Sequence, residues 1–481
     1  MWKKKTTCLT LLFVFLSSLI PRLILIKTSF WTSPDALEYI NVAKNLATGK
    51  GFITTIKIHH FDDGPIIRSA LGTKPPLFSL FIAPFYKLWP NLYFIQLINL
   101  ILGAAAAVFF YILCRQYLSV KWSLVAAFLL NYNPDFLINN RLILTEPLFL
   151  CCSFLALIFA NQSHSKQLFL SALFAVLAFL TRVEGISIAI TISLNLLFKK
   201  ERSQWRFFSS LFFLCLFPYL LLNYLTNKSF LTNVGNFHFL TLNFLETVFN
   251  QYGQPIPSLN NFVLTNWLNI LKNILNTSLM LLKTLLKPSA IGLLIIPIIT
   301  TKPTKKIMPF LLIILINFLI ICFTWGLIVD PSRYLLLIDS MLILLAILRI
   351  TKFKKIVRFI FIGTTLIFYF IFDGHRLYWA RTQFDPSWNG EDINKIILLI
   401  NEQTKPNDVI AAPNPGLINI KTDRPAVVLP NNLNFKLINQ FIHNYQPKAF
   451  LTYSPESTTF FTLNNLKWKK IKTGPYYLFF Q

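Results

Sequence analysis

Long apolar runs are the feature that most constrains how this chain folds. The runs from Leu9 to Ile26 and from Leu311 to Val329 are each about as long as a helix that crosses the hydrocarbon core of a bilayer. Only 13% of the 481 residues are charged, about half of what a soluble domain needs to cover its surface. The sequence therefore predicts a polytopic membrane protein.

The fold class expected from these runs is an all-α polytopic membrane protein with about eleven transmembrane helices and a large first extracytoplasmic loop. A further apolar segment, residues 76–89, is too short to span comfortably and is expected to be re-entrant or interfacial. The predicted spans are residues 7–26, 92–114, 122–138, 145–160, 167–181, 184–198, 206–224, 284–300, 307–328, 334–348 and 355–372.

Basic residues set the predicted orientation. The net charge of +26 would suggest nucleic acid in a soluble protein. Here the basic residues gather in alternate short loops between apolar runs, so membrane topology is the better interpretation, and no nucleic-acid partner is expected. The positive-inside bias places the N-terminus in the cytoplasm and, with an odd number of spans, the C-terminus outside. The cationic groups are Lys3 to Lys5, Arg115 with Lys121, Lys199 to Arg206, Lys302 to Lys306 and Arg349 to Arg358.

The chain is expected to divide into two parts. Residues 1–373 form the transmembrane domain, with a first outer loop at 27–75 and a second at 226–282. Residues 374–481 form a small soluble extracytoplasmic α/β tail. Strands are expected at 408–412, 426–429 and 449–453, helices at 391–403 and 434–445, and a turn at 414–416. The tail is interpreted as a packing or acceptor-guiding module.

Two acidic residues open the first outer loop. Asp35 and Glu38 lie at the start of a helix that is expected to end near Gly49. One interpretation is that Asp35 only caps this helix. The other is a carboxylate at the membrane face that accepts a proton from an incoming nucleophile, with Glu38 one turn along as a second base or cation ligand. At the end of the loop, Lys74 precedes two prolines and is either an interfacial anchor or a ligand for a lipid-linked phosphate.

Three more clusters are predicted on the same outer side. Ionisable residues at span junctions are costly and often functional. Arg141 and Glu146 flank a tight connection and could simply pair with each other. Asp339, inside a late span, is expected to meet a cation. The remaining cluster residues are Arg182 with Glu184, and Arg333 with Tyr334.

No metal or cofactor is required by these patterns. The six cysteines lie in or at the ends of apolar spans and show no disulfide or metal-binding spacing. His59, His60, Asp62 and Asp63 are residue types that suit a divalent metal, but solvated loop charge is the favoured interpretation.

The five clusters, in this order, resemble a known family. The matching elements are the acidic start of the first loop, Lys74-Pro-Pro-Leu, Leu144-Thr-Glu-Pro-Leu, Leu180-Thr-Arg-Val-Glu-Gly and Ser332-Arg-Tyr-Leu-Leu. They resemble the C-type superfamily of integral-membrane glycosyltransferases (the GT-C fold). Within it, the closest likeness is to the polyprenyl- or dolichyl-phosphate-sugar transferases, which include protein mannosyltransferases and aminoarabinose transferases.

The resemblance implies an inverting transfer of a hexose or pentose from a polyprenyl-phosphate donor to a lipid, glycan or protein acceptor. It implies a bacterial inner-membrane enzyme of cell-envelope glycosylation, with Asp35 as catalytic base. Supporting acidic residues are Glu38 and Glu146; donor phosphate ligands are Lys74 and Arg333; further candidates are Arg141, Arg182 and Tyr334. The alternatives are a transporter or flippase of a lipid-linked or anionic substrate, and a non-catalytic membrane protein. A transporter would predict internal repeats, and none is found.

Overall fold

The computed structural model describes most of the chain. The described residues are 4–26, 32–60, 64–161, 164–228, 230, 252, 259–287, 289–299, 307–324, 331–382, 390–430, 435–453 and 468–481. In the second predicted outer loop, residues 229, 231–251 and 253–258 lie outside these ranges.

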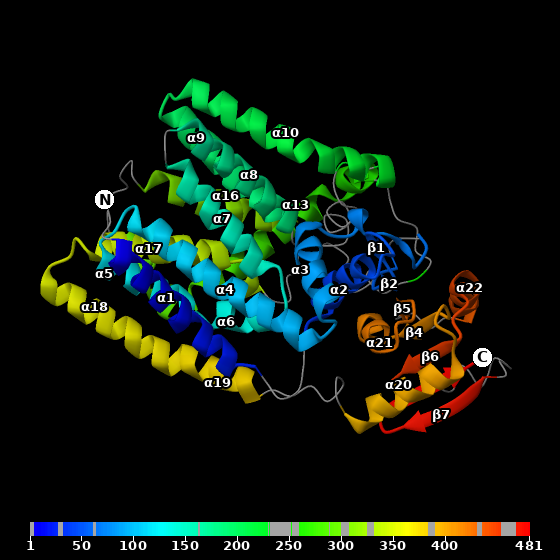
Figure 1. Cartoon of the computed structure of the whole chain (residues 1–481). Coiled ribbons are helices and arrows are strands. Elements are labelled where there is room, and N and C mark those ends of the chain that lie inside the picture. Colours follow the sequence, from blue (N-terminus) through cyan, green and yellow to red (C-terminus); the bar gives the residue numbers. More distant parts are fainter. Residues whose placement is uncertain are drawn as a thin grey trace.

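A bundle of helices makes up the larger part of the molecule (Figure 1). Helix α4 lies against α1, α5 and α7, α7 lies against α8, and α8 against α9 and α10. The bounds are α1 Lys4–Ile24, α4 Leu92–Arg115, α5 Val120–Asn131, α6 Pro134–Arg141, α7 Glu146–Ala160, α8 Ser165–Thr181, α9 Ile186–Phe198, α10 Arg202–Asn227, α13 Leu259–Leu285, α14 Ala290–Leu293, α15 Ile296–Ile299, α16 Met308–Thr324, α17 Leu336–Ile350, α18 Lys355–Phe368 and α19 Gly374–Thr382.

Three helices in the described part of the chain are long and apolar enough to cross a membrane, Leu92–Arg115, Arg202–Asn227 and Lys355–Tyr378, beside several shorter apolar helices. The expected total of eleven spans remains a prediction. The last long helix continues through a π-helical turn, η4 (Tyr369–Asp373), into α19. It therefore runs past residue 373, where the tail was expected to begin.

Two predicted spans are not single helices. The span expected at 122–138 breaks between α5 and α6, because Asn133 caps α6 by accepting a hydrogen bond from the Asp135 amide at 2.9 Å, and Pro134 follows at the first helical position. The span expected at 284–300 contains the end of α13 and two single-turn helices, α14 and α15, with Pro297 inside the second. Proline lacks the amide hydrogen that a continuous helix needs.

One helix of the first outer loop, α2, and the helix that follows the loop, α3, lie between the bundle and the tail (Figure 1). Helix α2 (Pro34–Ala47) ends just before Gly49, which has a φ of +78°. Helix α3 (Leu77–Leu88) is the short apolar segment, and it buries Phe78 and Ile82. Two short strands, β1 (Ile53–Thr54) and β3 (Arg68–Ser69), pair antiparallel and lead into a 3-10 turn, η1 (Ala70–Gly72).

The tail forms a six-stranded mixed sheet in the order β2-β5-β4-β6-β8-β7. Strand β2 (Ile56–Lys57) comes from the first outer loop and pairs parallel with β5. The remaining elements are α20 Glu391–Gln403, β4 Ile410–Ala412, α21 Pro415–Thr422, β5 Ala426–Val428, α22 Phe435–Tyr445, β6 Ala449–Thr452, β7 Lys469–Thr473 and β8 Tyr476–Phe480. The three predicted strands and both predicted helices form; the turn expected at 414–416 is instead the start of α21, capped by Asn414.

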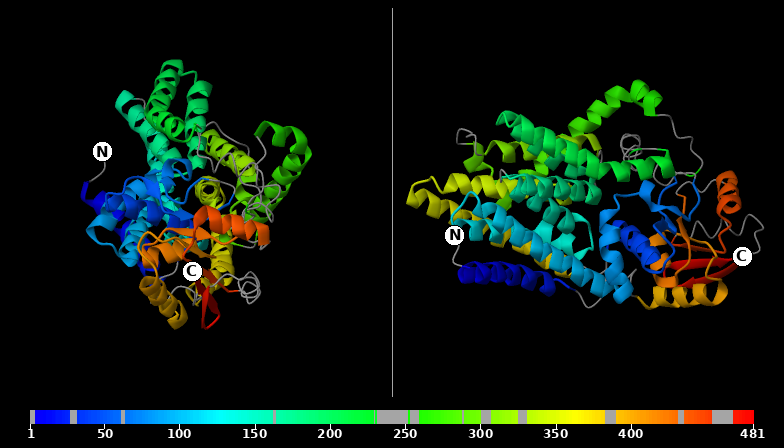
Figure 2. Two further views of the ribbon diagram at one scale, coloured as in Figure 1. Left: turned by 90° about the vertical axis from the view of Figure 1, so that its right-hand side faces the viewer. Right: turned by 45° about the horizontal axis from the view of Figure 1, so that its top comes forward.

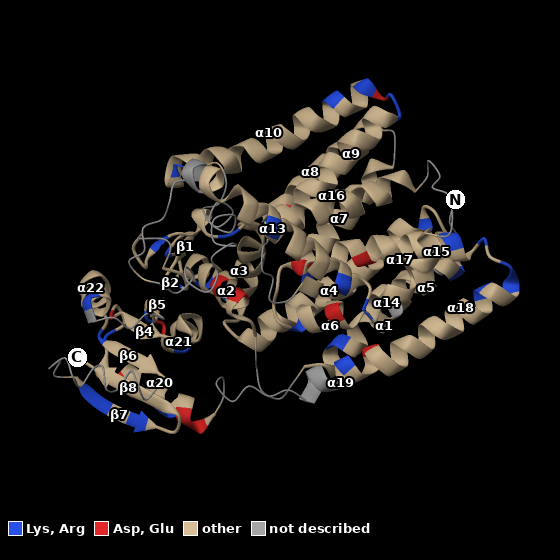
Figure 3. Cartoon of the chain, turned by 180° about the vertical axis from the view of Figure 1, so that it is seen from behind, with Lys and Arg blue, Asp and Glu red and all other residues tan. Residues whose placement is uncertain are grey.

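The molecule is elongated, with the tail sheet at one end (Figure 2). Lys and Arg residues gather at the other end, on the turns before α10 and α18 and near the N-terminus, and a further group lies on β7 of the tail (Figure 3). This separation matches the charge pattern from which the orientation of the chain is predicted.

Candidate functional site

Helix α2 presents two acidic side chains near its start, Asp35 in the first turn and Glu38 after it. Ser33 is the N-cap, and its hydroxyl accepts a hydrogen bond from the Ala36 amide at 3.2 Å. Asp35 is therefore not needed as the cap, which excludes the simplest structural interpretation of this residue. Its carboxylate meets two cations instead, and Glu38 lies one turn further along the helix.

Lys74 is the first of these cations. Its ammonium lies 3.1 Å from Asp35 Oδ1, contacts Glu38 and sits 4.9 Å from the centre of the Tyr39 ring. The two prolines that follow it begin α3, which packs on α2 with the Tyr39 and Phe78 rings edge to face. Packing between the two helices thus fixes the lysine beside both carboxylates.

Arg333 is the second cation and comes from the far end of the sequence. It ends a 3-10 turn, η3 (Pro331–Arg333), directly before α17. One terminal nitrogen lies 2.9 Å from Asp35 Oδ2, and Nε donates to Glu146 Oε1 at 2.8 Å. The guanidinium therefore bridges the carboxylate of the first loop and a carboxylate of the bundle.

Glu146 and Arg182 continue the network into the bundle. Glu146 starts α7, and its Oε1 also accepts from Arg182 at 2.7 Å. Arg182 follows α8 and reaches Glu184 at 3.1 Å. The Tyr334 ring lies beside both guanidinium groups, at 4.8 Å from Arg182 and 5.2 Å from Arg333.

The chain thus brings together seven of the eight site residues that the sequence predicts. They form one connected cluster: Asp35, Glu38, Lys74, Glu146, Arg182, Arg333 and Tyr334. The eighth, Arg141, is buried at the end of α6, where its carbonyl accepts a hydrogen bond from Gln96. Arg182 and Arg333 are the arginines that pair with Glu146.

Exposure separates the carboxylates by role. The Asp35 side chain is 39% exposed, whereas Glu38 is 14% and Glu146 only 2% exposed. An incoming hydroxyl can therefore reach Asp35, while Glu146 serves to hold the two arginines in place. Asp35 is therefore the most exposed of the three carboxylates.

Neighbouring charges and burial shift the pKa values of the ionisable side chains at this end of α2. Lys74 first, and then Arg333, hold the pKa of Asp35 well below its usual range. Burial raises the pKa of Glu38, despite the opposing effect of Lys74. For Lys74, burial disfavours the charged form, but Asp35 and Glu38 outweigh it and raise the lysine pKa. The resting cluster therefore holds a weakly basic Asp35 and a firmly protonated lysine.

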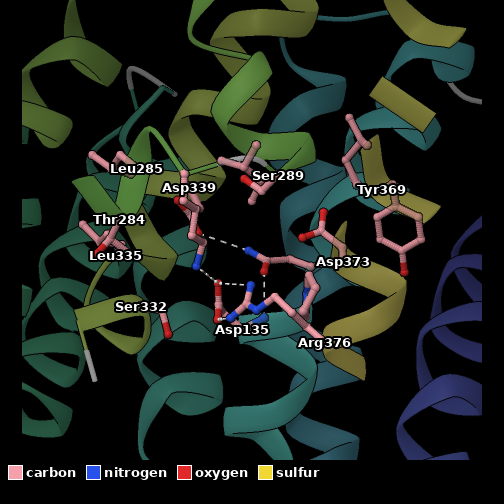
Figure 4. Close-up of a pocket in the computed structure, with 15 residues that line it drawn as sticks. Asp135, Thr284, Leu285, Ser289, Ser332, Leu335, Asp339, Tyr369, Asp373 and Arg376 are labelled. Atoms are coloured by element: carbon pink, nitrogen blue, oxygen red, sulfur yellow. Dashed lines mark hydrogen bonds and ion pairs between the residues drawn. The ribbon is translucent and has the colours of Figure 1, made fainter. Parts of the chain in front are cut away.

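A second polar cluster lies on the other side of η3, around a pocket (Figure 4). Asp135 is bound there by Arg376 and lies 3.3 Å from Lys287. Asp339, expected to meet a cation, accepts a hydrogen bond from the amide of Asn133 at 3.1 Å. Sequence reasoning missed Asp135, Lys287 and Arg376, because they come from α6, the bend after α13 and α19, and match no motif.

His59, His60, Asp62 and Asp63 of the first outer loop are the residues whose types suit a divalent metal. His60 is buried and stacks edge to face on Tyr252 and Phe441 rather than facing solvent. Asp62 and Asp63 lie outside the described residues. Among those described, no group of three or more His, Cys, Asp or Glu side chains could hold a metal ion.

Comparisons with known proteins place the chain in a family and a fold. The model of the family DUF2079, described as a predicted membrane protein, matches residues 38–449. The chain belongs to this family. The matched residues include the site residues from Glu38 to Arg333 and much of the tail. No curated protein matches the sequence.

Solved structures share the fold of this DUF2079 protein. ArnT from Cupriavidus metallidurans in the apo state superposes with a TM-score of 0.60 at 10% identity, covering 97% of each chain. An oligosaccharyltransferase from Archaeoglobus fulgidus with a tethered acceptor peptide gives 0.58 at 12% identity, covering 92% of this chain and 69% of that one. AglB from the same organism, in complex with an inhibitory peptide and a dolichol-phosphate, gives 0.52 at 11% identity, covering 94% and 70%. The DUF2079 protein therefore has the GT-C membrane fold that its motifs resemble, and it is a membrane protein.

Proposed function

We propose that this protein is an inverting glycosyltransferase of a bacterial inner membrane. It moves a sugar from a polyprenyl-phosphate donor to a hydroxyl of a lipid, glycan or protein acceptor on the extracytoplasmic face. The observation that carries the proposal is the half-exposed carboxylate of Asp35 held between Lys74 and Arg333. Asp35 contacts both Lys74 and Arg333, and a base beside two cations suits a reaction that takes up a proton and releases a phosphate.

Donor binding exchanges partners within the cluster. A phosphate presents more negative charge than a carboxylate, so Lys74 and Arg333 turn part of their hydrogen bonding to it. Arg182 stays on Glu146 and Glu184, because that ion triad is buried. Glu146 thereby keeps Arg333 near its resting position while the donor phosphate binds.

The same exchange activates the base. In the resting cluster, Lys74 and Arg333 make Asp35 a weak base. Once a phosphate draws the two cations away, the Asp35 pKa rises towards its usual range and the carboxylate becomes able to take a proton. Base activation is therefore coupled to the presence of the donor.

The transfer itself is a single displacement. The acceptor oxygen attacks the anomeric carbon from the face opposite the lipid phosphate, and a new carbon–oxygen bond forms as the bond to the phosphate oxygen breaks. The electron pair of the broken bond stays on the phosphate, next to Lys74 and Arg333. The acceptor proton passes to Asp35, and the anomeric centre is inverted. These steps use only side chains of the protein.

The test is transfer of labelled sugar. Purified protein is incubated with labelled sugars on polyprenyl phosphate and with an extract of envelope lipids and glycans as acceptor. We expect wild type and Glu402→Gln, a matched change of an exposed carboxyl on α20, to form labelled product, and Asp35→Asn to form none. Full activity in Asp35→Asn would exclude it as the base. Movement of intact donor across a vesicle, without a new glycosidic product, would favour the transporter.

Lys74 gives a second, separate test. Lys74→Ala is expected to raise the KM for the donor much more than the KM for the acceptor, because the lysine contacts the phosphate and not the attacking hydroxyl. Equal effects on both would contradict a role for Lys74 in phosphate binding.

A further inference from the structure

An apolar groove lies at a distance from the candidate site, between α1, α5, α17 and α18. It encloses about 450 Å³. Its walls are made almost wholly of hydrocarbon side chains, among them Val14, Val125, Ile347, Phe361 and Leu366. A volume of this size is comparable to pockets that hold small organic ligands.

Of the four polar side chains on the groove walls, three (Ser17, Asn131 and Thr365) make hydrogen bonds within the protein, and the fourth is Tyr132. The Ser17 hydroxyl donates to the Val14 carbonyl at 3.0 Å, and the Thr365 hydroxyl donates to the Phe361 carbonyl at 2.9 Å. The Asn131 amide donates to the Ser17 carbonyl at 3.1 Å. Because these groups are satisfied within the protein, the groove favours a hydrocarbon guest over a polar one.

One end of the groove is strongly cationic. Arg358 lies one turn before the groove residues Phe361 and Ile362, and its guanidinium sits 5.5 Å from the centre of the Trp122 ring. It is anchored there by hydrogen bonds to the carbonyls of Thr351 and Phe353, at 3.0 and 2.8 Å. Four exposed lysines surround it on the same turns: Lys121, Lys352, Lys354 and Lys355.

No acidic residue offsets these cations within the helices that form the groove mouth. Residues 120–131 and 347–366 contain no Asp or Glu. The cations belong to the basic end of the bundle, away from the tail (Figure 3). A membrane-embedded apolar groove with a basic mouth has one natural complement, which is a lipid with an anionic head group.

We propose that this groove binds one anionic phospholipid, with an acyl chain along α5 and α18 and the phosphate on Arg358 and the neighbouring lysines. The donor lipid of the proposed reaction is not this guest, because its phosphate belongs at Lys74, and the α2–α3 region lies next to the tail, at the other end of the molecule (Figure 1). The site therefore does not depend on the proposed function.

The charge of the mouth is tested with two matched triple variants. One replaces Lys352, Lys354 and Lys355 by glutamine; the other makes the same charge change away from the groove, at Lys199, Lys200 and Arg202. Native mass spectrometry of purified protein with added phosphatidylglycerol or phosphatidylcholine measures retention. We expect wild type and the second variant to keep one phosphatidylglycerol and little phosphatidylcholine. The first variant should bind it on the order of 100-fold more weakly, from roughly 1 kcal/mol per charge.

The groove itself is tested with Val125→Phe, which fills part of it, beside Ile360→Phe on the exposed face of α18. Loss of phosphatidylglycerol in the first only is expected. The proposal would be overturned if wild type retained phosphatidylglycerol and phosphatidylcholine equally, or if both triple variants lost phosphatidylglycerol equally. It would also be overturned if a folded Val125→Phe protein bound phosphatidylglycerol as well as wild type does. Val125→Leu replaces the larger change if that protein does not fold. Retention of polyprenyl phosphate that depends on Val125 and not on Lys74 would also overturn it.

Discussion

Asp35→Asn should separate binding from catalysis in a way that few active-site variants do. The carboxylate pairs with Lys74 and Arg333 at 3.1 and 2.9 Å, and in the proposed mechanism it competes with the donor phosphate for these two cations. Asparagine removes the negative charge and keeps the shape, so both cations become free for phosphate. The variant is therefore expected to bind a long-chain polyprenyl phosphate more tightly than wild type, while it transfers no sugar.

The size of this effect follows from the exposure of the pairs. Asp35 is 39% exposed, so each ion pair is screened and is worth about 0.5 to 1 kcal/mol rather than the value of a buried pair. Losing two such competing contacts gives about 1 to 2 kcal/mol, which corresponds to a dissociation constant roughly 5- to 30-fold lower. The screening also predicts that the gain shrinks as salt is added.

The assay is titration of polyprenyl phosphate into purified wild type, Asp35→Asn and Glu402→Gln, at low and high salt. The surface variant should bind like wild type. An Asp35→Asn protein that binds polyprenyl phosphate no better than wild type would refute the competition between carboxylate and phosphate. The proposed coupling of donor binding to base activation would then fall with it, even if transfer were abolished.

Three further outcomes are expected. Glu146→Gln leaves the buried Arg182 and the partly buried Arg333 without their shared charge and should destabilise the protein by about 3 to 5 kcal/mol in chemical denaturation, whereas Glu402→Gln should change it little. Because folding lowers the pKa of Asp35, the stability that this residue contributes is present above its ordinary pKa and is lost as pH falls through its lower folded pKa. In thermal melts, Asp35→Asn should therefore lose less stability at acid pH than wild type does. Asn41→Ala removes a buried amide that joins α2 to Asn419 of the tail at 2.7 Å, and should lower the melting temperature while a neighbouring exposed change, Lys50→Ala, should not.

The sequence predicted the members of the site better than their partners. Motif order identified Asp35, Lys74, Glu146 and Arg333, because each lies beside a proline or a helix start that local rules detect. It did not reveal that one arginine joins Asp35 to Glu146, because Arg333 lies 298 and 187 residues away from them and the contact depends on how η3 meets α2. Pairing of this kind is set by tertiary packing and leaves no local pattern.

The boundaries of the membrane helices were also only partly predictable from the sequence. Hydropathy found the apolar segments but merged α5 with α6, since Leu, Phe and Ile continue across the break that Asn133 and Pro134 make. In the tail, the strands at 410–412 and 426–428 were predicted from short apolar runs, whereas β7 was missed because four of its five residues are polar. An edge strand carries lysines for solubility, so its pattern resembles a loop.

The parallel pairing of β2 with β5 also bears on how the protein is made. Strand β2 belongs to the loop that carries Asp35, but the strand that it pairs with is synthesised only after all of the bundle helices. During synthesis β2 therefore has no parallel partner until the tail is made, after the helices of the bundle. The first outer loop completes its strand pairing only when the tail has folded, so we expect a chain that stops early in the tail to leave an incompletely folded loop and an inactive protein.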